Sequence, residues 1–498
     1  MPDPAVLFTV AEILAYVVIC HVIGCTLLLA IRLRIPGVIP PYPLLGSAAL
    51  ATQLWAYGFV HIPWNAITLL LPWVIAGAIM RRRLVATFRG QAMTARSLLR
   101  GIGRIDPVIG ALAAISVLLF AAYALSLFLH PAVTWDAVAF WLFKAKLFFI
   151  DQHVDPASSA LASIPELDIN RNQEYPPLYS LMVASTWVIA GRVEEALGNA
   201  LNLIGLVAVV ATMSSVLRPL LGSRFTAVTV FLFLALPSAS PFLVDGYYFG
   251  YADYLLASWM VLALLYVQVG AADEAADVMA VACAVGAALT KNDGTPLLGA
   301  VLVVLLVRRL WRWRWQKSLP PLRNVALVGI CVLPVIIWQF TWQLPGTITP
   351  RMLNQDPLSL LPELPSRAAT ILDIVGRQAS RRNTDFWLML AVPLALVMMA
   401  IDRFRAGRAL AAAFTLQLLS YFAVYLFTPL ELTTHLWQSA DRVLLQLAPA
   451  SILMLAVSSA PYARLAGRRK SQPEPTVRAA DVLTLPTVAE RKAGAAVS

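Results

Sequence analysis

Apolar stretches of bilayer length recur along almost the whole chain, and this feature most restricts what the chain can fold into. Residues 6–31 carry one charged side chain, Glu12, and residues 106–129 carry only Asp106. A segment in lipid must satisfy its backbone hydrogen bonds internally, which an α-helix of about 20 residues does. The chain is 59% hydrophobic and 13% charged, whereas soluble proteins are about a quarter charged. The sequence therefore predicts an all-α polytopic membrane protein.

Thirteen spanning helices are predicted from these runs, and an odd number places the two termini on opposite sides of the membrane. The predicted spans are 6–31, 43–59, 64–80, 106–129, 197–217, 225–243, 252–269, 278–290, 295–307, 324–343, 387–401, 409–428 and 443–460. The spans 278–290 and 295–307 are short for a hydrocarbon core of about 30 Å. Residues 176–191 are also apolar, but this segment is marginal in length, so we expect a juxtamembrane or re-entrant helix that packs against protein.

Basic segments predict the orientation of the helices. Residues 81–104 contain seven arginines and no acid, and residues 308–323 contain six basic residues and no acid. Residues 402–408 and the tail after Arg464 are also basic. Because Lys and Arg accumulate in cytoplasmic loops, these segments should face the cytoplasm. The loops expected on the extracytoplasmic side are then 130–196, 244–251, 291–294, 344–386 and 429–442.

Several function classes lose support from what the sequence lacks. The net charge of +11 comes from basic residues in particular loops, which indicates membrane topology and no nucleic-acid partner. The four cysteines lie within apolar runs and show no metal-binding spacing. The chain contains no GxxxxGK[ST], HExxH or GxSxG motif, which disfavours ATP-driven transport and serine hydrolysis.

The stretch "TWDAVAFWLFKAK" (134–146) places one acid at the exit of an apolar helix. Asp136 stands between Trp135 and Trp141, and Lys144 and Lys146 follow. A partly desolvated carboxylate at this position could act as a general base, and a lysine behind it could hold a phosphate. An acid in an interfacial loop, with belt tryptophans and lysines that reach the lipid headgroups, explains the same residues without catalysis.

A second acid precedes the helix start "EYPPLY". Glu174 stands next to Tyr175, and Tyr179 follows the Pro-Pro pair, which suits a first helical turn. A carboxylate at a helix N-terminus also has a purely structural explanation as a cap. The functional interpretation is that Glu174 belongs to a paired-carboxylate site near the membrane.

Two further polar clusters interrupt the apolar helices in the middle of the chain. "GYAD" places Tyr251 and Asp253 at the expected outer end of a helix, where tyrosines can stack on a sugar or form an interfacial belt. "TKNDG" places Lys291, Asn292 and Asp293 in a short turn between two apolar segments. A lysine in such a turn is either a capping residue or an anion ligand.

The C-terminal part of the chain supplies the remaining candidates. "TTHLWQSADR" contains His435, Asp441 and Arg442; Asp441 is expected to be a helix N-cap, and Arg442 has a guanidinium suited to phosphate oxygens. The outer loop 344–386 runs against the charge bias with five arginines. These are Arg351, Arg367, Arg377, Arg381 and Arg382. An arriving phosphate group, or anionic lipid headgroups, would explain them.

This combination of an outer-loop acid, "EYPPLY", "GYAD" and "TKNDG" resembles the GT-C superfamily of integral-membrane glycosyltransferases. The pattern is most similar to the family 39/83-like group, which includes protein O-mannosyltransferases and lipid A aminoarabinose transferases. The resemblance implies a helix bundle with juxtamembrane helices in its first large outer loop. It also implies that Asp136, Glu174 and Asp253 are the catalytic acids.

The sequence departs from the family pattern at two positions. The O-mannosyltransferases have an adjacent Asp-Glu pair, but Ala137 follows Asp136 here. Many relatives have Lys or His where this chain has Tyr175, so phosphate binding would shift to Lys144, Lys291 or Arg442.

The resemblance covers about 106–460 and divides the chain into three parts. Residues 1–105 are expected to add three N-terminal helices and a basic cytoplasmic loop. Residues 106–460 form the expected catalytic core, and residues 461–498 an expected disordered cytoplasmic tail.

The expected function is transfer of a sugar from a polyprenyl-phosphate donor to a glycan, lipid or protein acceptor, with membrane lipids as further partners. The site is expected on the extracytoplasmic face of a bacterial cytoplasmic membrane. The acids could bind a divalent cation, although no ligand spacing requires one. A transporter or flippase of a lipid-linked glycan remains an alternative, as does an O-antigen-ligase-like enzyme that uses His435 and the outer arginines.

Overall fold

The computed structural model describes the chain from residue 4 to residue 468 with several gaps. The described ranges are 4–101, 106–129, 136–154, 175–235, 250–271, 273–316, 320–341, 357–381, 385–401 and 407–468. All regular elements in these ranges are helical, without a strand. Seven helices are long and apolar enough to cross a membrane, and five further apolar helices are shorter. The predicted all-α polytopic fold is confirmed, whereas the number of thirteen spans stays a prediction.

The N-terminal helices form a closely packed group. They are α1 (Pro4–Ala30), α2 (Tyr42–Val60), α3 (Ala66–Ile79) and α4 (Arg81–Gly101). Helices α1 and α2 approach each other at glycines, since a Cβ atom on Gly24 would lie 2.0 Å from the carbonyl oxygen of Tyr42. Asn65 caps α3 through the backbone N–H groups of Ile67 and Thr68. The basic segment 81–104 was expected to be a loop, but most of it forms α4, which continues almost directly from α3.

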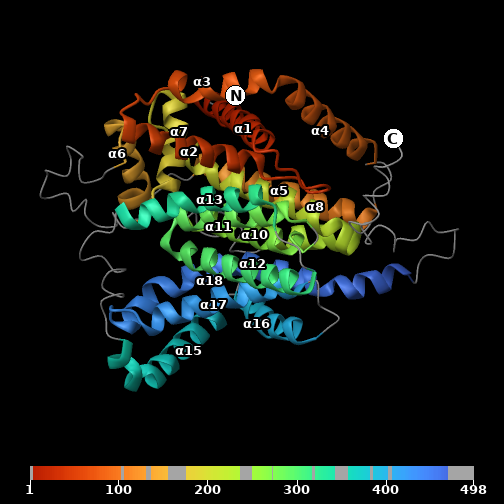
Figure 1. Cartoon of the computed structure of the whole chain (residues 1–498), viewed down its shortest axis with the longest axis vertical. Helices are drawn as coiled ribbons and strands as arrows, with labels where there is room; N and C mark the ends of the chain where they lie inside the picture. The colour runs from red at the N-terminus through yellow and green to blue at the C-terminus, as the bar shows by residue number, and fades with distance from the viewer. Residues whose placement is uncertain are drawn as a thin grey trace, which may run out of the picture.

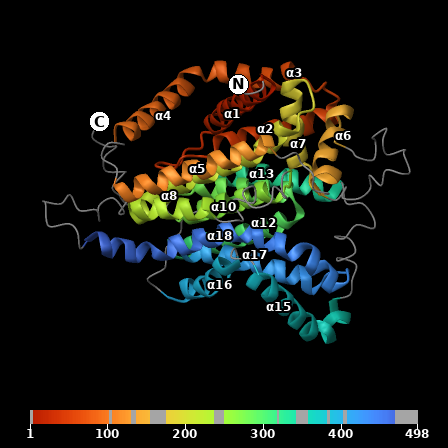
Figure 2. The same cartoon turned by 180° about the vertical axis from the view of Figure 1, so that it is seen from behind.

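The next group of helices contains a short, buried helix, Leu178–Ala190. It consists of α5 (Pro107–Leu129), the π-helix η2 (Ala137–Leu142), α6 (Phe143–Asp151), α7 (Leu178–Ala190) and α8 (Glu195–Ala235). Figures 1 and 2 show α6 and α7 at one end of the bundle, across the direction of the longer helices. All residues of α7 from Leu178 to Val188 are buried. Helix α7 therefore packs against protein, as expected for a segment that does not face lipid.

Helix α8 contains both of the predicted helices 197–217 and 225–243 as far as the structure describes them. Its backbone breaks at Gly222, which has φ 78° and ψ 169°. The positive φ is accessible to glycine without strain. The break falls in the predicted turn "RPLLGSR" (218–224).

The centre of the molecule is formed by α10 (Asp253–Val269), α11 (Ala275–Thr290), the 3-10 turn η5 (Asn292–Gly294), α12 (Thr295–Gln316) and α13 (Leu322–Thr341). Every residue of α10 from Asp253 to Gln268 is buried. The residues after the predicted span 295–307 were expected to be a loop, but α12 continues to Gln316. Its added turns are held by ion pairs of Arg308 and Arg309 with Asp277 of α11.

The C-terminal part contains η6 (Pro357–Glu363), α15 (Leu364–Arg381), α16 (Asp385–Ala400), α17 (Arg408–Leu426) and α18 (Leu432–Arg468). More than half of the expected outer loop 344–386 is thus helical. Arg367 of α15 donates hydrogen bonds to the carbonyl oxygens of Leu426 and Thr428. This arginine satisfies backbone groups at the end of α17, a structural use that the interpretation as a headgroup ligand did not include.

Helix α18 begins eleven residues earlier than the predicted span 443–460. The carboxylate of Glu431 accepts hydrogen bonds from the N–H groups of Thr433 and Thr434, at the start of the helix. The prediction that Asp441 is an N-cap was therefore wrong, because Asp441 lies inside the helix and Glu431 provides the capping carboxylate.

The N-terminal helices belong to the same hydrophobic core as the rest of the bundle. The Tyr16 hydroxyl of α1 lies 2.9 Å from Ser185 Oγ of α7, and Glu12 forms two short hydrogen bonds with Arg192. Figure 1 shows the helices stacked from α1–α4 at the top to α15 at the bottom. We call the end of the bundle where α10, α12 and α18 begin the site end, and the end where α12 stops the basic end.

Candidate functional site

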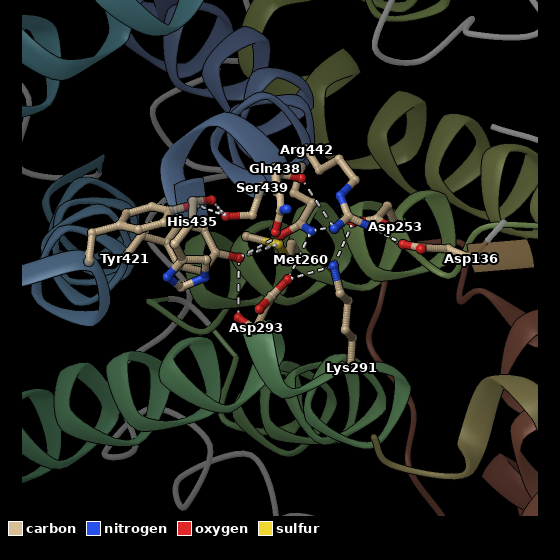
Figure 3. A network of polar contacts seen from close by, with 12 residues as sticks. Asp136, Asp253, Met260, Lys291, Asp293, Tyr421, His435, Gln438, Ser439 and Arg442 are labelled. Atoms are coloured by element: carbon tan, nitrogen blue, oxygen red, sulfur yellow. Dashed lines mark hydrogen bonds and ion pairs between the residues drawn. The ribbon is translucent and has the colours of Figure 1, made fainter. Parts of the chain in front are cut away.

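Acidic and basic side chains from four separate stretches of the chain meet at the site end and form one polar network (Figure 3). We call this set the site network. Its charged members are Asp136, Asp253, Lys291, Asp293 and Arg442. All five were candidate residues from the sequence, and the fold brings them together although up to 306 positions separate them.

Lys291 occupies the centre of the site network. Its Nζ atom lies 2.9 Å from Oδ1 of Asp253 and 2.8 Å from Oδ2 of Asp293. Lys291 and Asp253 are almost fully buried, with 5% and 2% of their surfaces exposed. Removing one partner of such a buried pair leaves an uncompensated charge and is strongly destabilising. In the structure the lysine therefore balances two carboxylates, and its predicted contact with an anion stays a prediction.

The turn "TKNDG" places Lys291 and Asp293 where they can share this interaction. Helix α11 ends at Thr290, and the backbone of Lys291 is extended, with φ −157° and ψ 149°. Gly294 then packs against α11, because a Cβ atom there would lie 2.2 Å from the carbonyl carbon of Ala287. The absence of a side chain at Gly294 allows the turn to fold back tightly.

Gln446 of α18 joins the two carboxylates of the site network. Its Nε2 atom lies 2.5 Å from Oδ1 of Asp253 and 3.2 Å from Oδ2 of Asp293. The Tyr421 hydroxyl lies 2.8 Å from Oε1 of Gln446 and 3.1 Å from the carbonyl oxygen of Asp293. Gln417 donates to that same carbonyl oxygen at 3.2 Å.

Gln446, Tyr421 and Gln417 were not among the candidates predicted from the sequence. A pattern that could have found them is the spacing of polar residues within apolar helices. Gln446 comes four residues after Arg442, and Tyr421 four residues after Gln417. Residues four apart lie on one face of a helix, so each pair marks a polar face of α18 or α17.

Asp136 forms an ion pair with Arg442 at one edge of the site network. The Asp136 side chain is 24% exposed, in contrast to the buried Asp253. The guanidinium of Arg442 also lies over the ring of Tyr251, 5.9 Å from its centroid. Arg442 interacts electrostatically with Asp253 as well, so the Asp136 pair and the Lys291 cluster act on each other.

His435 lies on the other side of the site network from Asp136 (Figure 3). Its Nδ1 atom lies 2.8 Å from the hydroxyl oxygen of Thr428, and its ring contacts the Tyr425 ring edge to face. Burial lowers the pKa of His435 below its ordinary value, a shift that Asp293 opposes and Arg442 increases. The histidine therefore stays neutral to a lower pH than a free imidazole.

Lys144 and Lys146 have partners outside the site network. Lys144 is buried, and its Nζ atom donates to the carbonyl oxygen of Tyr175 at 2.5 Å. Lys146 forms an ion pair of 3.1 Å with Glu195. In the structure these lysines connect η2 and α6 to the chain around α7, and their predicted contact with a phosphate stays a prediction.

Three predicted aromatic residues stack beside the site network. The Trp141 ring lies 5.2 Å from the Tyr175 ring and 5.8 Å from the Tyr179 ring, measured between centroids. Tyr175 interacts electrostatically with Lys291 and Arg442. These aromatic side chains thus border the charged groups, and Asn292 lies beside Asp293 in η5.

Trp135 and Glu174 fall outside the described residues, so their predicted roles stay predictions. The side chain of Asp441 also falls outside them, so a contact of Asp441 with the substrate stays a prediction, although the residue is not an N-cap. No group of three or more His, Cys, Asp or Glu side chains in the described ranges could hold a metal ion.

Residues 174–338 match the family model of the dolichyl-phosphate-mannose-protein mannosyltransferases. The matched segment includes Tyr251, Asp253, Lys291 and Asp293, whereas Asp136 and Arg442 lie outside it. Neither the curated proteins nor the solved structures contain a significant match to the chain.

Proposed function

We infer that this protein is a GT-C membrane glycosyltransferase that uses a lipid-linked sugar. A segment that matches the mannosyltransferase family and the helical membrane fold support this inference. The enzyme transfers a sugar from a polyprenyl-phosphate donor to a hydroxyl group of an acceptor, and Asp136 is the general base. The oxygen of the acceptor attacks the anomeric carbon, and the bond from this carbon to the phosphate oxygen breaks. Polyprenyl phosphate leaves, and the acceptor proton passes to Asp136.

The observation that carries this proposal is the ion pair between Asp136 and Arg442. The guanidinium holds the carboxylate in a fixed position beside the site network, and a general base has to be positioned in this way to reach the acceptor hydroxyl group. The partial exposure of Asp136 gives an acceptor access to it. Asp253, by contrast, is buried and bound to Lys291, so it suits a positioning role better than direct proton transfer.

Arg442 and Lys291 support binding of the donor phosphate. Both cations lie within the site network and next to Tyr175. Preorganised cations stabilise the negative charge that develops on a leaving phosphate. In this proposal the phosphate enters beside Arg442 and Lys291 while the sugar faces Asp136.

The distribution of basic residues supports an extracytoplasmic site. The basic helix α4 precedes α5, and Asp136 of the site network follows α5 in the chain. The arginines of α12 lie near its end, whereas Lys291 and Asp293 directly precede its start. Since basic segments favour the cytoplasm, the site network faces the other side of the membrane, in a bacterial cytoplasmic membrane.

The name of the matched family supports a hexose, and mannose in particular, as the first donor sugar to test. A glycan, lipid or protein could each provide the acceptor hydroxyl. The ligase alternative has less support, because Arg367 is used by backbone carbonyl groups and Arg377 pairs with Asp373.

The decisive experiment measures transfer from radiolabelled polyprenyl-phosphate mannose, and then other sugars, by the purified protein in nanodiscs. Removing a general base should reduce the rate by about 10²- to 10⁴-fold, so Asp136→Asn should lose transfer while remaining folded. The matched control is Asp373→Asn, which removes another arginine-paired acid outside the site network and should keep full activity.

Equal activity of Asp136→Asn and wild type would refute the assignment of the base. If wild type transfers no sugar from any donor but moves lipid-linked sugar across liposomes, the protein is a flippase, and the proposed function is wrong.

A further inference from the structure

A second polar cluster lies beside the site network, in the interior between α7, α8 and α10. Asn199 and Asn202 of α8 are 1% and 4% exposed, and Tyr179 of α7 is fully buried. The Tyr179 hydroxyl, Oδ1 of Asn199 and both amide atoms of Asn202 find no hydrogen-bond partner among the described residues. The second carboxylate oxygen of Asp253 also lacks one there.

These groups face the same region. Asn199 and Asn202 are three residues apart, which places them on neighbouring positions of one helix face. The Tyr179 hydroxyl lies within reach of the Asn202 side chain and interacts electrostatically with Asp253. The contact between Tyr179 and Asn202 does not have the distance and angle of a regular hydrogen bond.

Two glycines of α8 mark the same face as the contact surface with the other helices. A Cβ atom on Gly198 would lie 2.9 Å from Val183 of α7, and one on Gly205 would lie 2.8 Å from Ser258 of α10. Asn202 stands between these glycines in the sequence, so it lies where α8 meets both helices. We call Tyr179, Asn199 and Asn202 the amide cluster.

Unpartnered polar atoms in such a place call for an explanation. Most buried polar groups in proteins have a hydrogen-bond partner, and lipid cannot provide one. An apolar side chain at Asn199 or Asn202 would pack in the same space without this penalty. A bound polar ligand would provide hydrogen-bond partners for the unpartnered atoms of the amide cluster.

The groups available define the class of that ligand. The Asn202 amide and the Tyr179 hydroxyl can donate and accept hydrogen bonds, and Oδ1 of Asn199 and the free oxygen of Asp253 can accept them. The three residues of the amide cluster, Tyr179, Asn199 and Asn202, include no cation. This set suits neutral hydroxyl groups better than a phosphate, and the Trp141 ring beside Tyr179 adds an aromatic surface suited to a sugar ring.

We propose that the amide cluster binds ring hydroxyl groups of the donor sugar and so determines which sugar is transferred. This inference rests on the proposed function. Arg442 and Lys291 contact the phosphate of the donor, and the amide cluster, together with the free oxygen of Asp253, contacts its sugar. The two sets of residues thus recognise the two parts of the same molecule.

The first test uses the ligand-free protein in detergent and measures the melting temperature of Asn202→Leu. Leucine has a similar size and removes only unpartnered amide atoms, so the melting temperature should stay the same or rise. A clear fall would show that Asn202 has a structural partner and would overturn the proposal. Asn199→Leu is the second variant and should behave in the same way.

The second test compares transfer from polyprenyl-phosphate mannose with transfer from donors that lack single ring hydroxyl groups. For wild type, at least one deoxy donor should react about 10- to 100-fold more slowly, because the missing hydroxyl group leaves site groups unpaired. In Asn202→Leu the native donor should be slowed by a similar factor, and the same deoxy donor should not be slowed further. Gln268→Leu, which removes a buried amide at the other end of α10, should keep wild-type selectivity.

The outcomes separate the two proposals. If the rate loss from Asn202→Leu and the rate loss from a deoxy donor multiply, the two changes act independently and the amide cluster does not bind that hydroxyl group. If the losses multiply for every deoxy donor, the assignment of the amide cluster is wrong, while the proposed function stands. Failure of wild type to transfer sugar from any donor would refute the proposed function and this inference with it.

Discussion

Two acid–cation networks lie at opposite ends of the helices α10, α11 and α12. At the site end, Asp253 pairs with one cation, Lys291, and with the amide of Gln446. At the basic end, Asp277 pairs with both Arg308 and Arg309, and Glu274 pairs with Arg309 and Arg312. The two basic-end carboxylates thus share three arginines, whereas the buried carboxylate at the site end forms an ion pair with one lysine and has Arg442 only as an electrostatic neighbour.

The two networks also differ in how far apart their members lie in the chain. At the basic end the partners are 31 to 38 positions apart and belong to one pair of neighbouring helices. At the site end, Gln446 and Asp253 are 193 positions apart, and Arg442 and Asp136 are 306 apart. The difference indicates that the basic end fastens one local helix pair, whereas the site end exists only when distant parts of the chain have packed together.

The largest expected difference is between Lys291→Met and Arg308→Met. The first change leaves Asp253 buried without its cation, which should lower the free energy of unfolding by about 3–5 kcal/mol and abolish transfer. The second leaves Asp277 paired with Arg309, so its effect on stability should be smaller and transfer should continue. Melting temperatures in detergent and transfer rates in nanodiscs measure both effects.

Equal destabilisation by the two changes would contradict this difference, because it would show that the second arginine provides no redundancy. Restoration of stability by the double change Lys291→Met with Asp253→Leu would support it, since both buried charges are then absent.

An intermediate effect is expected from Gln446→Leu. This substitution removes the amide that bridges Asp253 and Asp293, and a lost hydrogen bond to a charged group lowers stability by about 1.5–3 kcal/mol. Transfer should fall because the carboxylates lose their relative positions. The matched control is Gln438→Leu, two turns earlier on α18 and exposed, which should leave stability nearly unchanged. A variant of Gln446 with normal stability and normal turnover would contradict a positioning role.

The smallest expected effect is a dependence of stability on pH through His435. Its pKa is lower in the folded protein than the ordinary value of 6.5, so the unfolded chain binds a proton more readily. Stability should therefore decrease as the pH falls through about 6.5 and below. His435→Gln should reduce this decrease, measured as the melting temperature between about pH 8 and about pH 5.5. An identical pH dependence in the variant would show that the histidine does not contribute.

Sequence patterns predicted the helical elements well where the hydrophobic run itself decides the structure. The predicted spans 43–59, 324–343 and 409–428 each correspond to an observed helix, α2, α13 and α17. Predictions failed where polar side chains extend a helix beyond the apolar run. The arginines after residue 307 were interpreted as a loop, but pairing with Asp277 lets α12 continue. Glu431 likewise starts α18 in a segment that the sequence assigned to a loop.

The site residues show the same division. The charged members of the site network could be selected from the sequence, because charged groups at the ends of apolar helices cost free energy to bury and are therefore rare. These residues are Asp136, Asp253, Lys291, Asp293 and Arg442. Their partners could not be assigned in this way. Gln446 and the amide cluster are uncharged residues within apolar helices, and only packing shows that Gln446 bridges two carboxylates while Asn202 has no partner among the described residues.

Local patterns in the sequence were sufficient to predict the membrane class, most helix positions and the set of charged candidates, because hydrophobicity and charge act locally along a chain. Which acid is buried and bound, which is exposed beside an arginine, and which lysines connect helices outside the site network became known only from the packed helices. These pairings join residues that are between 31 and 306 positions apart in the chain, and such contacts arise only from the packing of the helices.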